Sequence, residues 1–565
     1  VSGKTYVYMA FAQDPGGDVI DSLFDAPTNG SQEDTGAGGE VVGNYATWSP
    51  LTAQTSGSIT LSNGNLDTTC GSTRTSCTST FPLTGKTYWE VTFGSGANNG
   101  FGMTEATGFN TVANNNSGLK YVGYQSYSYG WQQTEGNLYN ASNVLSSSPG
   151  AYSNGDVVGW AYDADNNTLK LYKNGSLQHT QTGIADAQYF PALHHSDNTA
   201  TSSVNFGQRP FAYAAPSGYK ALCTANLSDP TIADGSDYFD TKLWTGNSST
   251  QTISGYEFSP DFVWIKVRSE AGRSHFLFDT IRGTAKALKS DATDNEQTYS
   301  TSLTAFNSDG FSLGAWPNVN NNTKTIAGWA WDAGSSTVSN TDGSITSSVR
   351  ASAASGFSAV SWTGTATAGT IGHGLSAAPE FIITKRRDSS GNWFSQHASL
   401  GATHRIQLNQ TSAATSGTSL WNSTSPTSSV FSVGADNEVN ASGGTFIAYC
   451  FAPVAGFSAI GSYTGSSSFP FIHCGFRPAF IILKKHDGAD KWCMYDTARG
   501  TFNTLQTQLH PNTTDAESGD FFKFDILSNG FRPMDTSGQV NENGKNYIFY
   551  AVAENPFQAN GGLAR

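Results

Sequence analysis

The sequence has few charged residues, since only 13% of its 565 residues are Asp, Glu, Lys or Arg. Lys and Glu, which normally cover the exposed faces of helices, are therefore scarce. Aromatic residues reach 12%, and glycine occurs 61 times. β-Branched and aromatic residues favour strands, whereas Gly, Asn, Asp and Ser supply turns. The composition predicts an all-β, multi-domain protein with short strands and many loops.

The chain also lacks a basic charge balance and long apolar runs. Its formal net charge is −14 and its isoelectric point is near 5.1. Binding to nucleic-acid phosphates or to an anionic membrane surface needs a basic face, so we expect neither partner. No apolar run approaches the roughly 18 residues that a membrane-spanning helix needs.

Cysteine is sparse too, with six residues in the whole chain. This number does not make a disulfide-rich scaffold. Cys70 and Cys77 bracket a short Gly/Ser/Thr loop and could form a disulfide in an oxidising compartment; the alternative is that they do not pair. The chain has no CxxC motif, so we expect no structural zinc, no other metal and no cofactor.

Similar segments recur along the second half of the chain. The strand-like run GKNYIFYAVA (544–553) is similar to GGTFIAYCFA (443–452), KTIAGWAWDA (324–333) and GKTYVYMAFA (3–12). Pro-led apolar runs, which suit the start of a strand, begin near 259, 378 and 477. The pattern predicts three tandem β-sandwich modules. They cover 236–334, 356–455 and 456–557, with a Ser/Thr-rich linker at 335–355 and a tail at 558–565.

The run at 3–12 has no matching strands around it. We interpret residues 1–12 as the closing strand of a truncated upstream module, followed by a linker at 13–40. The alternative is that this strand completes a sheet elsewhere by strand addition to an exposed edge.

Residues 41–211 have a different pattern of strands and turns. They contain YWEV at 88–91, GDVVG at 155–159, the turn Asn174-Gly175, YFPA at 189–192 and VNFG at 204–207. These motifs, in this order over about 150 residues, resemble the SPRY family. The resemblance implies a bent two-sheet β-sandwich that serves as a protein-interaction module and not as an enzyme. A linker is expected at 212–235.

The segments DVIDSLFDAPTNG (18–30), GNYATWSPL (43–51) and LSNGNLDTT (61–69) are similar to virion proteins of marine tailed phages. The pairing of a SPRY-like domain with later β modules is similar as well. This resemblance implies a structural component of a phage particle.

Four aromatic residues form the main candidate ligand site, namely Tyr124, Tyr127, Tyr129 and Trp131. Positions 127, 129 and 131 alternate, so on a strand they share one face. Such a face can stack on sugars or peptides; the alternative is that it packs the sandwich.

Other polar clusters have structural explanations. The pairs Asp279/Arg282 and Asp496/Arg499 recur at one position of two modules, which favours a structural turn with the two charges paired. The set Asp163, Asp165 and Asn167 is interpreted as a hairpin turn and not as a calcium loop. The group His194, His195 and Asp197 has no supporting cluster for metal or acid–base chemistry. No common catalytic motif is present, and we expect no catalytic residue and no enzyme activity.

We therefore predict a phage virion structural protein, a tail fibre or capsid-surface component located on the virion or outside the cell. Its expected partners are other virion subunits or copies of itself in a homo-oligomer, and a host-surface glycan or protein. One alternative is a prokaryotic surface adhesin or filament subunit that assembles by strand addition. Another is a polysaccharide depolymerase, because the carboxylate pairs of glycosidases need no fixed sequence spacing.

Overall fold

The computed structural model describes residues 34–41, 43–53, 59–71, 75–105, 121–196, 199–227, 230–467, 469–519 and 523–556. The described residues divide into two compact units: unit 1 comprises residues 34–105 and 121–227, and unit 2 comprises residues 230–556. Strands dominate both units, as the composition predicts. The predicted closing strand at 1–12, most of the linker at 13–40 and the tail at 558–565 lie outside the described residues. No helix in the described ranges is long and apolar enough to cross a membrane.

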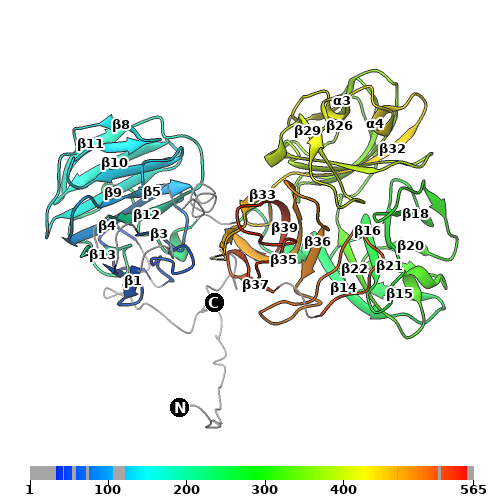
Figure 1. The fold of residues 1–565 in the computed structure, drawn as a ribbon, viewed down its shortest axis with the longest axis horizontal. Coiled ribbons are helices and arrows are strands. Elements are labelled where there is room, and N and C mark those ends of the chain that lie inside the picture. Colours follow the sequence, from blue (N-terminus) through cyan, green and yellow to red (C-terminus); the bar gives the residue numbers. More distant parts are fainter. Residues whose placement is uncertain are drawn as a thin grey trace, which may run out of the picture. The chain divides into compact units, whose positions relative to one another are not determined.

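Unit 1 is a sandwich of two antiparallel sheets (Figure 1). The seven-stranded sheet has the order β1 (Ile59–Ser62), β2 (Asp67–Cys70), β13 (Thr201–Asn205), β4 (Lys86–Ser95), β9 (Val157–Asp163), β10 (Thr168–Lys173) and β11 (Ser176–Gln181). The six-stranded sheet has the order β3 (Thr75–Thr78), β12 (Tyr189–His195), β5 (Gly100–Glu105), β6 (Ser128–Gln132), β7 (Leu138–Asn140) and β8 (Asn143–Ser146).

Tryptophans fill the space between these two sheets. Trp89 on β4 pairs across the ladder with Trp160 on β9, and their rings stack with centroids 5.9 Å apart. Trp131 on β6 of the opposite sheet lies 6.4 Å from Trp160. All three side chains are fully buried. Aromatic side chains remove large apolar areas from water, so this cluster stabilises the sandwich.

The other face of β4 is covered by the segment that follows the last strand. The backbone N–H groups of Ala212 and Tyr213 donate to the Glu90 carboxylate at 2.8 and 2.9 Å, and Tyr88 donates its backbone N–H to the Lys220 carbonyl. The expected linker at 212–235 is therefore wrong for residues 212–227, which pack on the sandwich. Buried polar groups on the outer face of β4 require these partners.

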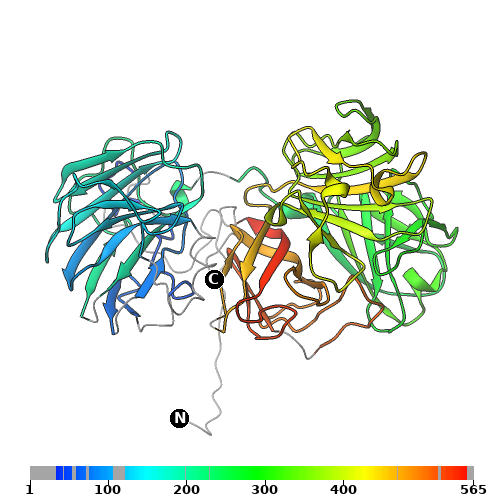
Figure 2. The same cartoon turned by 45° about the horizontal axis from the view of Figure 1, so that its top comes forward.

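Unit 2 consists of three lobes, which we define as residues 230–334, 335–455 and 456–556. Figures 1 and 2 show them in green, in yellow-green to yellow, and in orange to red. Lobe 1 has the sheet β14 (Phe239–Thr245), β22 (Thr325–Trp331), β16 (Phe262–Val267), β17 (His275–Asp279), β18 (Lys286–Lys289), β19 (Gln297–Thr298), and the small sheet β15 (Gln251–Ser254), β21 (Gly310–Leu313), β20 (Leu303–Asn307).

Lobe 2 has the sheet β23 (Val338–Asn340), β24 (Ser347–Ser352), β25 (Phe357–Thr363), β32 (Thr445–Phe451), β27 (Phe381–Arg386), β28 (Trp393–His397), β29 (His404–Gln407), β30 (Thr415–Ser416), and the pair β26 (Gly369–Gly372), β31 (Val430–Val433). Lobe 3 has the sheet β33 (Ser458–Thr464), β39 (Asn546–Pro556), β35 (Phe476–Lys485), β36 (Cys493–Asp496), and the sheet β34 (Ile472–His473), β38 (Gly530–Pro533), β37 (Phe524–Leu527).

The helices among the described residues of unit 2 are single turns. They are α2 (Pro317–Asn320), α3 (Thr418–Trp421), α4 (Asn437–Asn440), η2 (Gly235–Asp237) and η3 (Ala398–Leu400), while η1 (Thr224–Asn226) belongs to unit 1.

The segment 335–355 is not a linker, contrary to its prediction. It forms the hairpin β23–β24, and β24 pairs with β25 along six residue pairs. Its apolar content is low because only one face is buried: Val349 points into the lobe and is 1% exposed, whereas the neighbouring Ser348 is exposed.

The central strands of the three lobes occur in the same order. In each lobe a first strand (β14, β25 or β33) pairs with the last long strand of the lobe (β22, β32 or β39). That strand pairs with the Pro-led strand (β16, β27 or β35), and the Pro-led strand pairs with a short strand (β17, β28 or β36). A buried asparagine recurs as well, since Asn320, Asn440 and Asn541 each accept a backbone N–H and donate to backbone carbonyls of a neighbouring loop. Whether the lobes are repeats of one module stays a prediction.

Lobes 1 and 2 each have a hydrophobic cluster of their own, and all three lobes also share a further hydrophobic core. Aromatic side chains from each lobe meet there: Phe262 lies 4.1 Å from Tyr449, and Phe451 lies 4.7 Å from Tyr550, between ring centroids. Trp331 of lobe 1 donates its indole N–H to the Tyr550 hydroxyl of lobe 3 at 3.3 Å. The first lobe therefore contacts both others, and unit 2 is a single packed body.

Candidate functional site

Loops at one end of the unit 1 sandwich enclose a pocket of about 620 Å³. They are the β4–β5 turn, the segment before β6, the β6–β7 turn and the residue after β12. The described lining residues are Asn98, Tyr121, Tyr124, Gln132, Thr134, Glu135 and Ser196. Polar side chains and aromatic rings thus alternate around one cavity, although they come from sequence positions up to about 100 residues apart.

Two tyrosines, Tyr121 and Tyr124, line this pocket, and a third, Tyr139, stacks on Tyr124. The ring centroids of Tyr121 and Tyr124 are 5.1 Å apart, and Tyr124 stacks on Tyr139 at 5.2 Å with an interplanar angle of 23°. The Tyr139 hydroxyl donates a hydrogen bond to the Glu135 carboxylate, and this bond raises the pKa of Tyr139. The tyrosines therefore present flat, neutral rings beside a carboxylate.

Glycines and buried side chains position the loop that carries two of these tyrosines. A Cβ at Gly130 would lie 1.9 Å from the Val122 carbonyl oxygen, so only glycine lets the loop lie directly on β6. The Val122 carbonyl accepts from the Gln132 side chain at 2.9 Å, and its N–H donates to His194 Nδ1 at 3.1 Å. Both backbone polar groups of Val122 are therefore hydrogen-bonded, which fixes the loop at this residue.

Burial keeps the two histidines under the pocket uncharged. Desolvation lowers the pKa of His194 to about 3 and that of His195 to about 4. His195 lies between Thr68 Oγ1 at 2.9 Å and Asn99 Oδ1 at 3.1 Å. Glu135 is thus the one acidic residue among the described lining residues, and no lysine or arginine is among them.

The structure separates the four aromatic residues that the sequence placed together. Tyr124 lines the pocket. Tyr127 is 45% exposed and lies in the turn before β6 with a positive φ of 56°, so it does not share the strand face. Tyr129 and Trp131 are buried, and the Trp131 indole N–H donates to the Gly150 carbonyl at 2.9 Å. Ligand binding by these four residues stays a prediction.

Sequence reasoning did not single out Tyr121, Tyr139, Glu135 or Asn98. The spacing of Tyr121 and Tyr124 places both on one short loop, which was a usable signal. Glu135 and Asn98 had none, because loop residues converge only after the two sheets have paired.

The structure does not join Cys70 and Cys77 by a disulfide, which is one of the two possibilities that the sequence leaves open. Cys70 ends β2 in the seven-stranded sheet, whereas Cys77 lies in β3 of the other sheet. The Cys70 sulfur lies 3.2 Å from Thr75 Oγ1. Both side chains are buried, and desolvation raises the pKa of the Cys77 thiol.

Two further clusters have structural roles. The Asp163 carboxylate accepts the backbone N–H of Asn166 at 3.1 Å in the β9–β10 turn and lies 3.6 Å from Lys86 Nζ. Asp197 lies outside the described residues, so its relation to His194 and His195 is not described.

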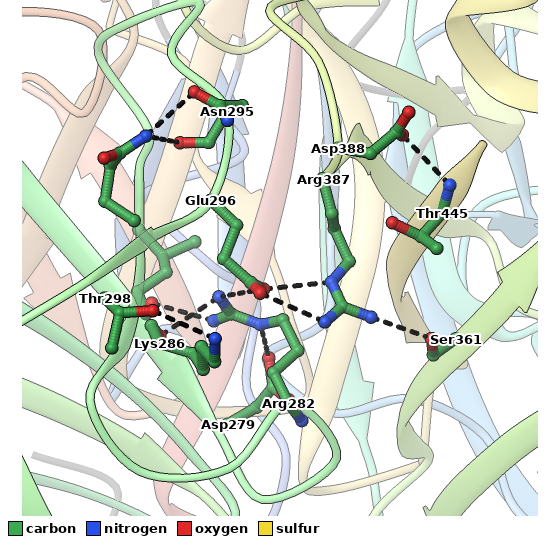
Figure 3. A network of polar contacts seen from close by, with 12 residues as sticks. Asp279, Arg282, Lys286, Asn295, Glu296, Thr298, Ser361, Arg387, Asp388 and Thr445 are labelled. Carbon is green, nitrogen blue, oxygen red and sulfur yellow. Dashed lines mark hydrogen bonds and ion pairs between the residues drawn. The ribbon is translucent and has the colours of Figure 1, made fainter.

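A second polar cluster lies between lobes 1 and 2 of unit 2, and Figure 3 shows it. Glu296 lies between two guanidinium groups, 3.4 Å from Arg282 Nη1 and 2.9 Å from Arg387 Nε. Arg282 also pairs with Asp279, and both side chains are fully buried. Arg387 of lobe 2 donates to Ser361 at 3.2 Å. This network, whose Asp279–Arg282 pair is fully buried, joins the two lobes.

The same arrangement joins lobes 3 and 1. Glu517 lies 2.8 Å from Arg499 Nη1 and 3.4 Å from Arg268 Nη2, while Arg499 pairs with Asp496 at 2.5 Å. Trp329 of lobe 1 donates its indole N–H to the Asp496 carboxylate at 2.9 Å. The Asp/Arg pairs are therefore structural, as the recurrence of their spacing indicates.

The interface between lobes 2 and 3 has different side chains at these positions. His397 takes the place of the aspartate, and its Nε2 lies 3.2 Å from the Phe549 carbonyl. The backbone contacts are nevertheless similar: Ala414 N–H donates to the His486 carbonyl, just as Glu296 N–H donates to that of Arg387. Desolvation lowers the pKa of His397 to about 4, so this histidine is uncharged at neutral pH.

The SPRY family model matches residues 86–209, so unit 1 contains a SPRY domain. Solved structures to which the chain is similar include the SPRY domain of human HERC1 (15% identity, 28% of this chain, 96% of that chain, TM-score 0.22). They also include the TRIM65 PSpry domain (15%, 29%, 91%, 0.25) and stonustoxin (19%, 28%, 27%, 0.24). The curated protein ssh4 of Sclerotinia sclerotiorum is 29% identical over 147 residues, which are 25% of this chain and 28% of that protein.

Unit 2 carries the match that covers most of the sequence. The family model described as "Domain of unknown function (DUF7483)" matches residues 234–556, more than half of the chain, and the protein belongs to this family. The chain is thus a β-rich protein in which a SPRY domain precedes a DUF7483 domain.

Proposed function

We propose that the protein is a non-enzymatic recognition protein whose SPRY domain binds a glycan in the tyrosine-lined pocket. The observation that carries the proposal is the pair Tyr121 and Tyr124, which lines the pocket beside Glu135 and is supported by the stacking of Tyr139 on Tyr124. Tyrosine rings offer flat apolar faces with a polar edge, which suit the C–H faces of a sugar ring. Amide and carboxylate groups around the pocket can bond its hydroxyls.

The pocket also fits recognition better than catalysis. Glu135 is the single carboxylate among its described lining residues, whereas hydrolysis of a glycosidic bond usually needs two carboxyl groups about 5–10 Å apart. The two histidines beneath are buried and neutral. Unit 2, with its shared core and buried ion pairs, serves in this proposal as a rigid support.

The setting that we propose is the surface of a phage particle, with a host-surface glycan as the ligand. The similarity of residues 18–30, 43–51 and 61–69 to phage virion proteins supports it, as does a surface rich in uncharged polar residues. An adhesin on a prokaryotic cell would use the same pocket. Mass spectrometry of purified virions from the source sample distinguishes the two settings, because only the first predicts the chain in particles.

A glycan array probed with the full chain tests the binding function. We expect retained glycans, with at least tenfold weaker binding for Tyr124→Ala and weaker binding for Glu135→Gln. Tyr127→Ala is the matched control, because Tyr127 is exposed but does not line the pocket. Equal binding by Tyr124→Ala and the wild type, or cleavage of the retained glycan, would contradict the proposal.

A further inference from the structure

One lobe of unit 2 carries a built-in example of strand addition. The hairpin strand β24 lies along the edge of β25, and Arg350 on β24 is paired with Ala359 on β25. The Arg350 side chain reaches lobe 1, where its Nε lies 2.6 Å from the buried carboxylate of Asp261. An added strand in lobe 2 thus supplies a cation to a carboxylate of the preceding lobe.

The corresponding edge in lobe 1 has no added strand among the described residues. Strand β14 is the terminal strand of its sheet, and Thr241 on β14 corresponds to Ala359, because Phe239 and Phe357 pair with equivalent residues of β22 and β32. The backbones of Tyr238 and Gly246 form hydrogen bonds to the residues just beyond the two ends of β22. Backbone groups of successive strand residues point in opposite directions, so the odd-numbered residues between these two direct their N–H and C=O groups away from β22. The Thr241 N–H indeed donates to the Asp240 carboxylate, 2.6 Å away, and not to β22.

A pocket of about 240 Å³ lies beside this edge, between lobes 1 and 3. Its lining includes Asp240 and Thr241 of lobe 1, and Ala479, Thr497 and Glu554 of lobe 3. Ala479 holds the position that Asp261 holds in lobe 1, directly before the apolar run of the Pro-led strand. At the edge of lobe 2, the Arg350 side chain occupies the space beside Asp261. The corresponding space at the edge of lobe 1 is this pocket, which no described side chain fills.

Two carboxylates line the pocket, and each has a partly exposed cationic partner. The side chains of Asp240 and Glu554 are 28% and 41% exposed, and their ion-pair partners in the structure, Lys242 and Arg477, are themselves 30% and 36% exposed. Exposed ion pairs are weak, so an incoming cation can replace either partner. Lys242 keeps a second contact, because its Nζ lies 5.3 Å from the centre of the Tyr256 ring.

We propose that the β14 edge binds an extended basic segment of another protein. The segment adds to β14 as an antiparallel strand, and an arginine or lysine opposite Thr241 enters the pocket between Asp240 and Glu554. Main-chain bonds at a sheet edge supply affinity, and a side-chain pocket supplies specificity. A basic partner is favoured over a second copy of this chain, because two copies each carry a net charge of −14.

The experiment uses the full chain and a labelled nonapeptide with the sequence of residues 345–353, ITSSVRASA, whose arginine has the register of Arg350. We expect saturable binding by fluorescence polarisation, at least tenfold weaker for the peptide with glutamate in place of arginine. Asp240→Asn combined with Glu554→Gln should weaken binding at least fivefold, and Ala479→Phe, which fills the pocket, at least tenfold.

Glu380→Gln is the matched control, because Glu380 holds the position of Asp261 beside the third edge strand, β33. It should leave binding unchanged. The proposal is overturned if the peptide does not bind, if the pocket variants bind as the wild type does, or if Glu380→Gln weakens binding equally. It is also overturned if sedimentation velocity shows an oligomer that Ala479→Phe dissociates, since a second copy then occupies the edge. Glycan binding by the SPRY domain does not bear on these outcomes.

Discussion

The hydroxyl of Tyr449 donates a hydrogen bond to the buried carboxylate of Asp279, 2.7 Å away and 170 residues earlier in the chain. The bond crosses from lobe 2 to lobe 1, and Arg282 Nη2 approaches the same hydroxyl at 3.2 Å. Tyr449 thus supplies a further hydrogen-bond partner to the Asp279–Arg282 ion pair, which has no contact with water. Trp329 does the same for Asp496 at the next interface.

Removing this hydroxyl should destabilise unit 2 markedly. Tyr449→Phe leaves one oxygen of a buried charge with one partner fewer, and hydrogen bonds to charged groups contribute about 1.5–3 kcal/mol. We expect a loss of that size in the free energy of unfolding, measured by urea denaturation.

Tyr463→Phe is the control for Tyr449→Phe, because the Tyr463 hydroxyl is also buried but donates to a neutral group, the Val540 carbonyl, at 2.6 Å. It should lose about 0.5–1.5 kcal/mol. Equal losses for the two variants would show that the charge on Asp279 is unimportant.

Three buried lysines should make the free energy of unfolding of unit 2 vary with pH in the alkaline range. Lys266, Lys385 and Lys484 hold equivalent positions on the Pro-led strands, and desolvation lowers the pKa of each to about 8. Between pH 8 and 10.5 the unfolded chain keeps a proton that the folded chain has released. Unfolding then takes up protons, so each lysine makes the folded state more stable as the pH rises.

The prediction is tested by comparing the wild type with Lys385→Met. The free energy of unfolding of the wild type should rise relative to that of the variant by up to about 1.4 kcal/mol per pH unit in this window. Exposed Lys523 provides the control, and Lys523→Met should differ from the wild type by a constant amount. A constant difference for Lys385→Met would rule out the lowered pKa.

Buried histidines should have the complementary effect in acid. The pKa of His195 is lowered to about 4, so between pH 6.5 and 4 the unfolded chain binds a proton that the folded chain does not. Its contribution is complete above pH 6.5 and is lost as the pH falls. The wild type should lose stability relative to His195→Gln over this range, measured by urea denaturation at pH 7, 6, 5 and 4.5. His404→Gln, at an exposed position, should track the wild type; a parallel course for His195→Gln would refute the idea.

The position of the loop that carries Tyr121 and Tyr124 should depend on the absence of a side chain at Gly130. Gly130→Ala places a Cβ against the Val122 carbonyl, so the loop must lift from β6. We expect faster hydrogen exchange at the Val122 and Gly123 amides, which in the wild type donate to His194 and Ser128. Gly519→Ala, where nothing lies within 4 Å of the new Cβ, is the control. Unchanged exchange in Gly130→Ala would mean that the loop does not rest on β6.

The sequence predicted the strands more reliably than the contacts among them. The SPRY motif at 88–91 falls on β4, because its alternating side chains fill both the sandwich core and the face covered by residues 212–227. The segment 335–355 was misjudged, since an edge hairpin needs few apolar residues. Tyr127 was placed on a strand face because alternation alone does not show where a turn ends. The pocket and the Tyr449–Asp279 bond join residues far apart in sequence, and local pattern carries no information about such pairs.

The three interfaces of unit 2 form a closed circuit. Lobe 1 contacts lobe 2, lobe 2 contacts lobe 3, and lobe 3 contacts lobe 1 through Glu517 and Arg268. In an open array of repeats, evolution can add or delete a unit at either end while the remaining contacts persist. Within this circuit such a change would leave a charged, buried half-interface without its counterpart. The number of lobes in the DUF7483 domain should therefore be invariant among its members, while insertions such as the β23–β24 hairpin vary.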